Sequence, residues 1–576
     1  MKISNAVSLV AAIAALSTGA AQAQEQARSA DGFVETIGVC THFQYNGVYT
    51  NTFGDGQTLQ DRLVELGVRH IRDGANQYDY VHNIYYALYS RAGIRFTLNC
   101  VPFSDWPVSS TITRLKVHPE IVEGIEDPNE PDNSVWNYNG LSGYPADKAY
   151  ATDLYNAVKA DSSLSQISVL AFGMAGVGPV NSQLGPVPFE LENMHPYAGG
   201  NEPGRDLDGK WTDYADQQNY IFGRPTQPIV ITECGWSTAT GSSQGVSEKA
   251  QGKYFPRVFA EHFNRTRIVR THTYDAADDG TDINNYENGL GLVRADGSRK
   301  PAFTAEKNMI SLLQESSWNA SGKYWNRPSF SPGKLNYSFS ASTGDVHHAL
   351  LQKSNGDFYL MLWRNALSYD RSAHADIANG DAAVTITLGQ SISRVSQYRY
   401  DDSGNLNSSG LSINGNQIVV GVPDSVLFVK LTPSAGPPLN TRLGIRAYNG
   451  RYVSVVTSDA SHLQAAFAGS VGTWESFKFV DAGSGQVALY SNLTGKYVTC
   501  DLNESEHRLR ADWASNIDNW EKFVVVDRGG GSFSLWSPVA GRYVSADLNQ
   551  SSGVLRTDWA TGIGTWETFN WTPTVY

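Results

Sequence analysis

Cysteine is scarce in this sequence, which argues against a disulfide scaffold and against a metal site built from cysteines. Four cysteines among 576 residues are too few for a disulfide scaffold, and their scattered positions lack the spacing of a metal site. We expect small buried side chains at these positions, although an oxidising compartment would permit a disulfide. The four are Cys40, Cys100, Cys234 and Cys500.

Positive charge is also in short supply. The chain carries 44 Lys and Arg against 57 Asp and Glu, a net charge of -13. Nucleic acids and anionic membranes attract proteins through basic surfaces, which this composition does not favour. We therefore expect neither as a partner.

Long apolar runs are missing as well. No run after the first residues approaches the ~18 residues that span a bilayer. At the start of the chain, Lys2 precedes an apolar run over 6–16, and residues 21–23 (Ala-Gln-Ala) form a small-x-small cleavage pattern. This pattern predicts a signal peptide over 1–23 and a secreted protein, extracellular or periplasmic.

The sequence does have a regular alternation of apolar strand-like runs and amphipathic helical runs from about 33 to 315. Eight strand candidates with intervening helices predict an α/β fold, a (β/α)8 TIM barrel over 24–318. An open doubly wound sheet is the alternative. It would be expected to carry a Gly-rich phosphate loop after the first strand, and "GVCTHFQYNG" has none. The candidates are 36–40, 68–74, 94–100, 120–130, 167–173, 189–197, 228–236 and 267–276.

The pattern changes after the barrel. Between 319 and 432, short strand-like runs are separated by turn signals such as Asn355-Gly356, which is typical of an antiparallel β-sandwich. The Pro- and Gly-rich segment 433–440 predicts a linker.

The last segment, 441–576, contains a threefold repeat. The phrase Gly-(Arg/Lys)-Tyr-Val recurs with its Tyr at 452, 497 and 543, and a Trp recurs at 474, 520 and 566. Three copies of an all-β unit, each too small to bury its own core, predict a β-trefoil. The phrase resembles the fascin-like trefoils. We expect the repeated Tyr and Trp in the core.

Two other tryptophans of the trefoil are candidates for carbohydrate binding. Trp513 and Trp559 follow charged residues, and the first repeat has Phe467 at the same place.

Polar and aromatic residues follow the predicted barrel strands. Because the carboxyl ends of barrel strands share one rim, these side chains are expected to gather there, where barrel enzymes carry their chemistry. In chain order they are His42, Arg72, Asp73, Asn99, Asn129, Glu130, His195, Tyr197, Glu233, His272, Tyr274 and Asp275.

Two carboxyl groups stand out within that set. Glu130 follows the fourth strand and Glu233 the seventh, and these strands face each other across the mouth of an eight-stranded barrel. Hydrolysis of a glycosidic bond needs such a pair, one as a protonated acid and one as a nucleophile or base. The pair predicts a glycosidase.

The motifs around these acids resemble those of glycoside hydrolase clan A, the retaining (β/α)8 enzymes. The resemblance rests on "NEP" after the fourth strand, "HPY" after the sixth and "ITECGW" in the seventh. The passage "GLGLVRADGSRKPAF" (289–303) is similar to that of cellulase-like and xylosidase-like members. The resemblance covers about 33–432, and it is informative on mechanism but not on substrate.

The resemblance implies roles for individual residues. Glu130 matches the acid/base and Glu233 the nucleophile. The chain departs from the clan at strand eight, where Tyr274 stands in place of the usual Trp. The residues matched to substrate binding or to support of the nucleophile are Arg72, Asn129, His195, Tyr197, Tyr274 and Trp236.

Two further acidic segments have less distinctive surroundings. A second "NEP" at 201–203 lies in a Gly-rich loop and is interpreted as a solvated turn. Asp278, Asp279 and Asp282 could bind calcium, but they lack EF-hand spacing, and a solvated loop is favoured. We expect no metal and no cofactor.

The function expected from the sequence is that of a secreted, monomeric retaining glycosidase acting on a polysaccharide, with a trefoil that binds carbohydrate. The alternative is a lectin-like protein on a catalytically inactive barrel. An actin-bundling trefoil is a third and remote hypothesis. The glycan, its linkage and endo or exo action are left open.

Overall fold

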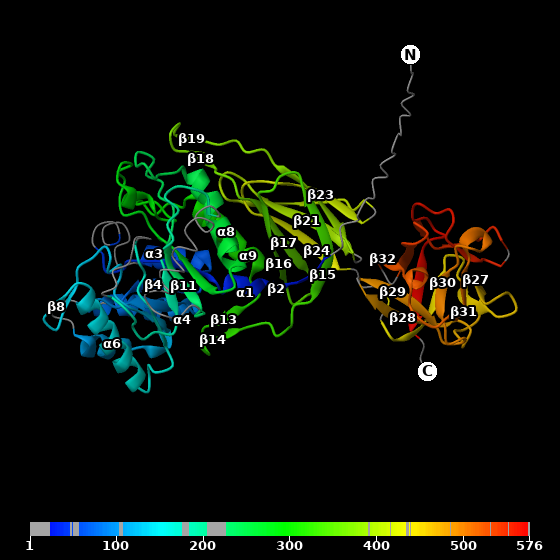
Figure 1. Ribbon diagram of the computed structural model, residues 1–576, viewed down its shortest axis with the longest axis horizontal. Helices are drawn as coiled ribbons and strands as arrows, with labels where there is room; N and C mark the ends of the chain where they lie inside the picture. The colour runs from blue at the N-terminus through cyan, green and yellow to red at the C-terminus, as the bar shows by residue number, and fades with distance from the viewer. Residues whose placement is uncertain are drawn as a thin grey trace, which may run out of the picture.

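The computed structural model has three parts in a row along its longest axis (Figure 1). The barrel lies at one end, the sandwich in the middle and the trefoil, in orange and red, at the other end. The structure describes residues 23–45, 49, 57–75, 77–102, 107–175, 184–203, 226–389, 392–414, 416–433, 437, 439–483, 485–529, 532–550 and 552–573.

Eight parallel strands form the barrel, each at a position predicted from the sequence. The sheet order β10-β11-β12-β3-β4-β5-β6-β9 is that of a barrel, and a parallel bridge between Leu170 and Leu191 joins the two end strands. The doubly wound alternative is therefore wrong. The strands are β3 (Ile37–Cys40), β4 (His70–Gly74), β5 (Arg95–Asn99), β6 (Val122–Glu126), β9 (Ser168–Leu170), β10 (Glu192–Met194), β11 (Ile229–Cys234) and β12 (Ile268–Thr273).

Helices cover the outside of this barrel and begin and end at sequence signals. Ser247 caps α8 by accepting a hydrogen bond from the Ala250 amide, and Pro301 occupies the first turn of α9. Gly93 ends α4 in the left-handed conformation. The helices are α1 (Ala30–Val34), α3 (Gln57–Leu66), α4 (Asp79–Ala92), α5 (Val108–Leu115), α6 (Tyr144–Ala160), α8 (Glu248–Asn264) and α9 (Pro301–Leu313).

Within the described ranges, no helix has the length and hydropathy needed to cross a membrane. The four cysteines are buried, and no disulfide bond joins any two of them.

Both predicted barrel boundaries need correction. Strands β1 (Ala23–Gln26) and β2 (Arg28–Ser29) pair with β15 (Lys334–Ala341) and β16 (Val346–Gln352) of the sandwich, so the barrel begins near α1 rather than at 24. At the other end, the hairpin of β13 (Ser317–Asn319) and β14 (Tyr324–Asn326) spans the expected boundary at 318. This hairpin packs on the barrel, because Trp318 and Trp325 donate to the carbonyls of Ser90 and Gly93.

The predicted sandwich consists of two sheets, antiparallel except where β2 pairs with β16 in parallel. One contains β1, β15 (Lys334–Ala341), β20 (Ala382–Leu388) and β23 (Gln417–Val422). The other joins β2 to β16 (Val346–Gln352), β17 (Phe358–Arg364), β24 (Leu427–Pro433), β21 (Ile392–Tyr400) and β22 (Leu406–Gly410). A small hairpin, β18 (Tyr369–Asp370) with β19 (Ala375–Asp376), extends from the sandwich.

Strand β17 of the second sheet is buried on both faces. Along β17, Leu360 and Leu362 point into the sandwich core, whereas Met361 and Trp363 join a cluster with α8 and α9 of the barrel. Side chains alternate across a strand, so a run such as "FYLMLW" supplies two cores at once. Barrel and sandwich therefore share a hydrophobic core.

The C-terminal part is a β-trefoil, as expected. Its strands are β25 (Arg442–Ala447), β26 (Tyr452–Val456), β27 (His462–Phe467), β28 (Ser476–Gly483), β29 (Gln486–Ser491), β30 (Tyr497–Cys500), β31 (Leu509–Ala514), β32 (Val524–Gly529), β33 (Ser532–Ser537), β34 (Arg542–Tyr543), β35 (Ser545–Ala546), β36 (Leu555–Arg556) and β37 (Phe569–Pro573).

The repeated Trp and Tyr residues are not core, contrary to expectation. Trp474 is 48% exposed, and the equivalent Trp520 and Trp566 are half-buried, as are the three repeated Tyr. The repeat instead buries the Glu that follows each Trp. In all three copies this Glu accepts a hydrogen bond from a Ser or Thr hydroxyl and one from a backbone amide, which satisfies its charge. The three are Glu475, Glu521 and Glu567.

The shared core predicts that the barrel does not fold without the sandwich. A chain ended after residue 318 would expose the cluster around Phe259 and Met309, at about 1.5–3 kcal/mol for each large apolar side chain. We expect this chain to aggregate, whereas a chain ended after residue 434 stays monodisperse. Size-exclusion chromatography and thermal unfolding compare the two. A soluble 1–318 chain that unfolds at the same temperature as 1–434 would contradict the shared core.

Candidate active site

A cavity of about 770 Å³ lies at the carboxyl ends of the barrel strands, the end where barrel enzymes carry their chemistry. Both predicted catalytic acids face it. The residues that line it are His42, Gln44, Tyr45, Arg72, Asp73, Gly74, Ala75, Gln77, Tyr78, Asn99, Val101, Asn129, Glu130, Ser134, Trp136, Tyr197, Glu233, Gln244, Tyr274, Tyr286, Glu287 and Leu290.

Glu233 lies near the end of β11 and is 7% exposed. Its two oxygens have different partners. Arg72 donates to Oε1 at 2.5 Å, and the Tyr197 hydroxyl donates to Oε2 at 2.9 Å. Both donors stabilise a negative charge on this carboxyl group and fix its orientation.

Glu130 is not on a strand, contrary to the prediction that the fourth strand ends there. Strand β6 ends at Glu126, and Glu130 follows in a loop with φ 42°, the left-handed region that non-glycine residues avoid at about 1–2 kcal/mol. Hydrogen bonds hold the loop, since the Glu130 amide donates to Gly173 and its carbonyl accepts from Asn133 and Ser134. Backbone held in this way is a common feature of functional sites.

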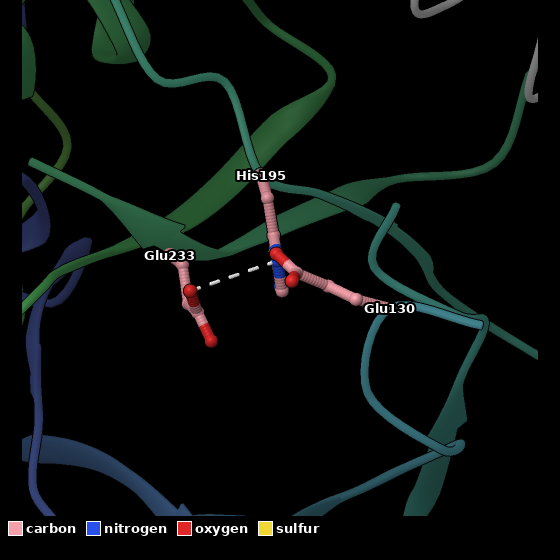
Figure 2. Close-up of side chains that lie close together, drawn as sticks. All are labelled: Glu130, His195 and Glu233. Carbon is pink, nitrogen blue, oxygen red and sulfur yellow. Dashed lines mark hydrogen bonds and ion pairs between the residues drawn. The ribbon is translucent and has the colours of Figure 1, made fainter. Parts of the chain in front are cut away.

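His195 lies between the two acids (Figure 2). Its Nδ1 is 2.8 Å from Glu130 Oε1 and 3.7 Å from Glu233 Oε2, and its Nε2 bonds the Thr232 hydroxyl at 2.8 Å. Gly173 makes room for the ring, because a Cβ there would come within 2.2 Å of Nε2. The sequence could not rank His195 above an ordinary core histidine, because its contacts come from three separate strands or loops.

The acids and His195 influence each other's proton affinity. Burial opposes the charge on His195, but the Glu233 charge and the Glu130 hydrogen bond outweigh it and raise the pKa of His195. For Glu130, burial would raise the pKa, but the hydrogen bond and charge of His195 lower it overall. In the resting site, the proton shared by Glu130 and His195 therefore lies on His195.

Arg72 on β4 is the centre of the network behind the acids. Besides Glu233, it donates twice to Glu126 at 2.8 Å, and it donates to Asn129 Oδ1 at 2.6 Å. Glu126 is fully buried and also accepts from Asn193 and Thr232. From the sequence, Glu126 was given no role of its own. The signal in the sequence was its position, because an acid at the end of an apolar strand is buried and needs a basic partner.

The other expected residues divide into two groups. Asn129 and Tyr274 line the cavity, and the Tyr274 ring lies 5.2 Å from that of His42 and 6.5 Å from that of Tyr197. Trp236 does not line it. The Trp236 side chain is 2% exposed, packs on Tyr254 and Phe255, and donates to the Asn201 carbonyl, so its assignment to substrate binding is wrong.

The second "NEP" is not a solvated turn either. Pro203 is buried, Glu202 is half-buried, and Asn201 accepts a hydrogen bond from Arg371 at 3.1 Å. Arg371 comes from the loop of the β18–β19 hairpin and also donates to the Gly199 carbonyl at 2.6 Å. The hairpin of the sandwich thus holds the segment that follows Tyr197.

Several cavity residues were not assigned a role from the sequence. The clearest is His42, whose ring stacks on Tyr45 at 4.2 Å. Burial and the Arg72 charge lower the pKa of His42 to about 3, so it is neutral. Its Nε2 is buried and has no hydrogen-bond partner within the described part of the chain. Glu287 also lines the cavity, and burial and the Glu233 charge raise its pKa.

Among the described residues, one group of side chains has the spacing of a metal site. The group is Glu130, His195 and Glu233, whose ligand atoms lie within 4.8 Å of one another. The calcium hypothesis and the favoured solvated loop are both wrong for Asp278, which is buried and pairs with Lys300 at 2.6 Å. Asp282 accepts from its neighbour Asn284.

Comparisons with known proteins give structural likeness only. No protein-family model matches the chain, and no curated protein matches it. A family 39 glycoside hydrolase from Bacteroides cellulosilyticus WH2 is 15% identical, with TM-score 0.47 over 70% of this chain and 81% of its own. A glucosidase from Croceicoccus marinus is 12% identical, with TM-score 0.43 over 65% and 92%. The designed ThreeFoil protein is 16% identical, with TM-score 0.21 over 23% and 99%.

The Arg72 network predicts a large cost for losing Glu126. Glu126→Gln removes one charge of a buried pair and should destabilise the barrel by about 3–5 kcal/mol. Asp61→Asn is the matched control, because Asp61 pairs with Arg91 at 2.6 Å on the exposed surface, where a pair contributes about 0–1 kcal/mol. Denaturant unfolding of both variants measures the difference. Equal, small effects would mean that Glu126 does not stabilise Arg72.

Proposed function

We propose that the protein is a retaining glycoside hydrolase that cleaves O-glycosidic bonds of a polysaccharide by double displacement. One observation carries the proposal: Glu130 and Glu233 face the same cavity with carboxyl oxygens within 4.8 Å of each other. Retaining glycosidases hold their carboxyl groups about 5–5.5 Å apart, and inverting enzymes about 6.5–9.5 Å. The separation therefore favours retention.

Glu233 is the nucleophile in this proposal. Arg72 and Tyr197 each donate to one of its oxygens and hold the carboxyl group facing the cavity, as attack on an anomeric carbon requires. When the glycosyl-enzyme forms, the charge of Glu233 is lost, and with it one of the causes of the raised pKa of His195.

Glu130 is the acid/base, and it shares its proton with His195. The Nδ1–Oε1 contact of 2.8 Å allows the proton to move between the two. A proton resting on His195 can therefore reach the leaving oxygen through Glu130, although the pKa of Glu130 is lowered in the resting site. After departure of the first product, Glu130 accepts a proton from the attacking water.

The cavity suits a sugar chain. Its volume falls in the ordinary range of ligand sites, and its lining combines aromatic rings with polar groups. Tyr45, Tyr78, Trp136 and Tyr286 offer flat surfaces for pyranose faces, and His42 offers an unpartnered ring nitrogen for a hydroxyl.

The remaining parts complete the proposal. The segment 1–23 would export the chain, and the trefoil would hold the barrel on its polymer through Trp513 and Trp559. We propose a monomer with no nucleic-acid or membrane partner, in keeping with the net charge of -13.

Replacing Glu233 and replacing Glu130 should reduce activity in different ways. Glu233→Ala should abolish turnover of every substrate, because no glycosyl-enzyme can form. Glu130→Ala should lose most activity on polysaccharide but keep activity on aryl glycosides, whose leaving groups need no proton. With a β-glycoside, azide should rescue Glu130→Ala and give the β-azide, which reports retention. Kinetics on both substrate types and NMR of the product measure this.

Glu202→Gln is the control, since it alters the other "NEP" and should leave rates within about twofold. Equal losses for Glu130→Ala on both substrate types would refute the assignment of roles, and an α-azide from Glu130→Ala would refute retention.

The shared proton predicts a pH effect. In the native site, the pair loses its proton as pH rises through the raised pKa of His195, which sets the basic limb of kcat/KM. In His195→Asn the proton rests on Glu130 alone, and a carboxyl group titrates below histidine. The basic limb should therefore move to lower pH by about one unit or more.

His42→Asn is the matched control for this experiment. His42 lines the same cavity, but its pKa is lowered to about 3, so it does not titrate in the range of the basic limb. The limb should stay in place whatever happens to KM. If the basic limb of kcat/KM does not move in His195→Asn, the proton of the native resting site lies on Glu130, and the proposal of a shared proton is wrong.

A further inference from the structure

Four residues of the second trefoil repeat form a connected group on the hairpin of β30 and β31. Asp501 is 5% exposed and contacts Arg510 at 3.2 Å. Arg510 in turn pairs with both oxygens of Asp512, at 2.8 and 2.5 Å. The guanidinium lies 6.0 Å from the ring of Trp513, which is 53% exposed. We call this set of four the quartet of the second repeat.

The third repeat builds the same quartet. Asp547 is 5% exposed and contacts Arg556 at 2.8 Å, and Arg556 pairs with Asp558 at 2.8 and 2.6 Å. The Arg556 guanidinium lies 5.2 Å from the ring of Trp559, which is 44% exposed. Identical contacts at equivalent positions argue against chance pairing of surface charges.

The first repeat lacks all four members at once. Its equivalent positions hold Val456, Gln464, Ala466 and Phe467. Its fold is nevertheless the same, because Leu463 is buried like Leu509 and Leu555, and Glu475 keeps the buried hydrogen bonds of the other repeats. One repeat therefore folds without the quartet, so the trefoil does not need the quartet for its structure.

The chemistry of the quartet indicates its ligand. An exposed indole offers a flat apolar face, and the carboxylate beside it is held in place by the arginine. A sugar ring presents both an apolar face and hydroxyl donors. Each quartet carries two carboxylates against one guanidinium, and Glu504 and Glu506 contact Arg510 and Arg556 as well. This excess of negative charge disfavours acidic glycans.

We propose that the trefoil binds neutral glycan at two equivalent sites, the quartets of the second and third repeats, and that the first repeat has no site. The inference extends the proposed function, because its ligand is the polymer on which the barrel is proposed to act. Two sites on one module can hold two segments of a chain, so binding to a long polymer gains from avidity and binding to a short oligosaccharide does not.

Affinity electrophoresis of the full chain tests the two sites. The chain carries Glu233→Gln so that no polymer is cleaved, and the gels contain laminarin, xylan or galactan as neutral probes. On at least one probe, Trp513→Ala and Trp559→Ala should each weaken the trefoil-dependent retention about threefold to tenfold, and the double variant should remove it. Retention that persists in the double variant is then due to the barrel.

Trp474→Ala is the matched control, since Trp474 is an exposed tryptophan of the first repeat outside any quartet. It should leave retention unchanged. Restoring the quartet in that repeat (Val456→Asp, Gln464→Arg, Ala466→Asp and Phe467→Trp together) should strengthen retention, which guards against variants that merely unfold.

Three outcomes would overturn the proposal: no difference between the double variant and its parent on any probe, an effect of Trp474→Ala equal to that of Trp513→Ala, or loss of all trefoil binding in one single variant and none in the other. Hydrolysis of an aryl glycoside by the chain with native Glu233 is measured separately. Failure of the barrel chemistry and failure of the trefoil sites are thus distinguished.

Discussion

One buried cation holds the candidate site together. Arg72 joins Glu126, Asn129 and Glu233 from three parts of the barrel, and it is 4% exposed. Two carboxylates in such a place would each be costly alone, and a guanidinium can bond both because its planar fork has several donors. The nucleophile proposed for this site therefore depends on a partner, Glu126, that has no part in the reaction. Because Arg72 bonds both Glu126 and Glu233, it stabilises the barrel wall and orients Glu233 at the same time.

The second requirement is that the rim segments keep their places around this network. His195 reaches both proposed catalytic acids because Gly173 leaves room for its ring. The segment after Tyr197 is held from outside the barrel by Arg371, on the sandwich hairpin. The shared core makes barrel and sandwich one folding unit, in which the sandwich supports both the rim and the helices of the barrel. The sandwich therefore contributes to the structure of the barrel and of its rim.

The trefoil provides an internal comparison that a single-copy domain cannot offer. Features present in all three repeats, such as the buried Glu with its Ser or Thr partner, are what the fold requires. Features present in only two repeats, such as the quartets, are not required for folding. The same comparison explains why the repeated tryptophans misled the sequence interpretation: repetition at a fixed spacing marks structural equivalence, but it does not say whether a side chain points inward.

The eight barrel strands, the sandwich, the threefold repeat and the two acids across the barrel mouth were all predictable from the sequence. These follow from short-range periodicity and from spacing, which are local properties of the chain. The folded structure was needed to show that Glu126 pairs with Arg72, that Glu130 lies beyond its strand, that Trp236 is buried away from the cavity, and that residues 23–29 belong to the sandwich. Each of these features depends on contacts between segments far apart in the chain. The stagger between strands and the packing of side chains determine which residues make those contacts. A local pattern specifies which element a residue joins, and the packing of those elements specifies what that residue touches.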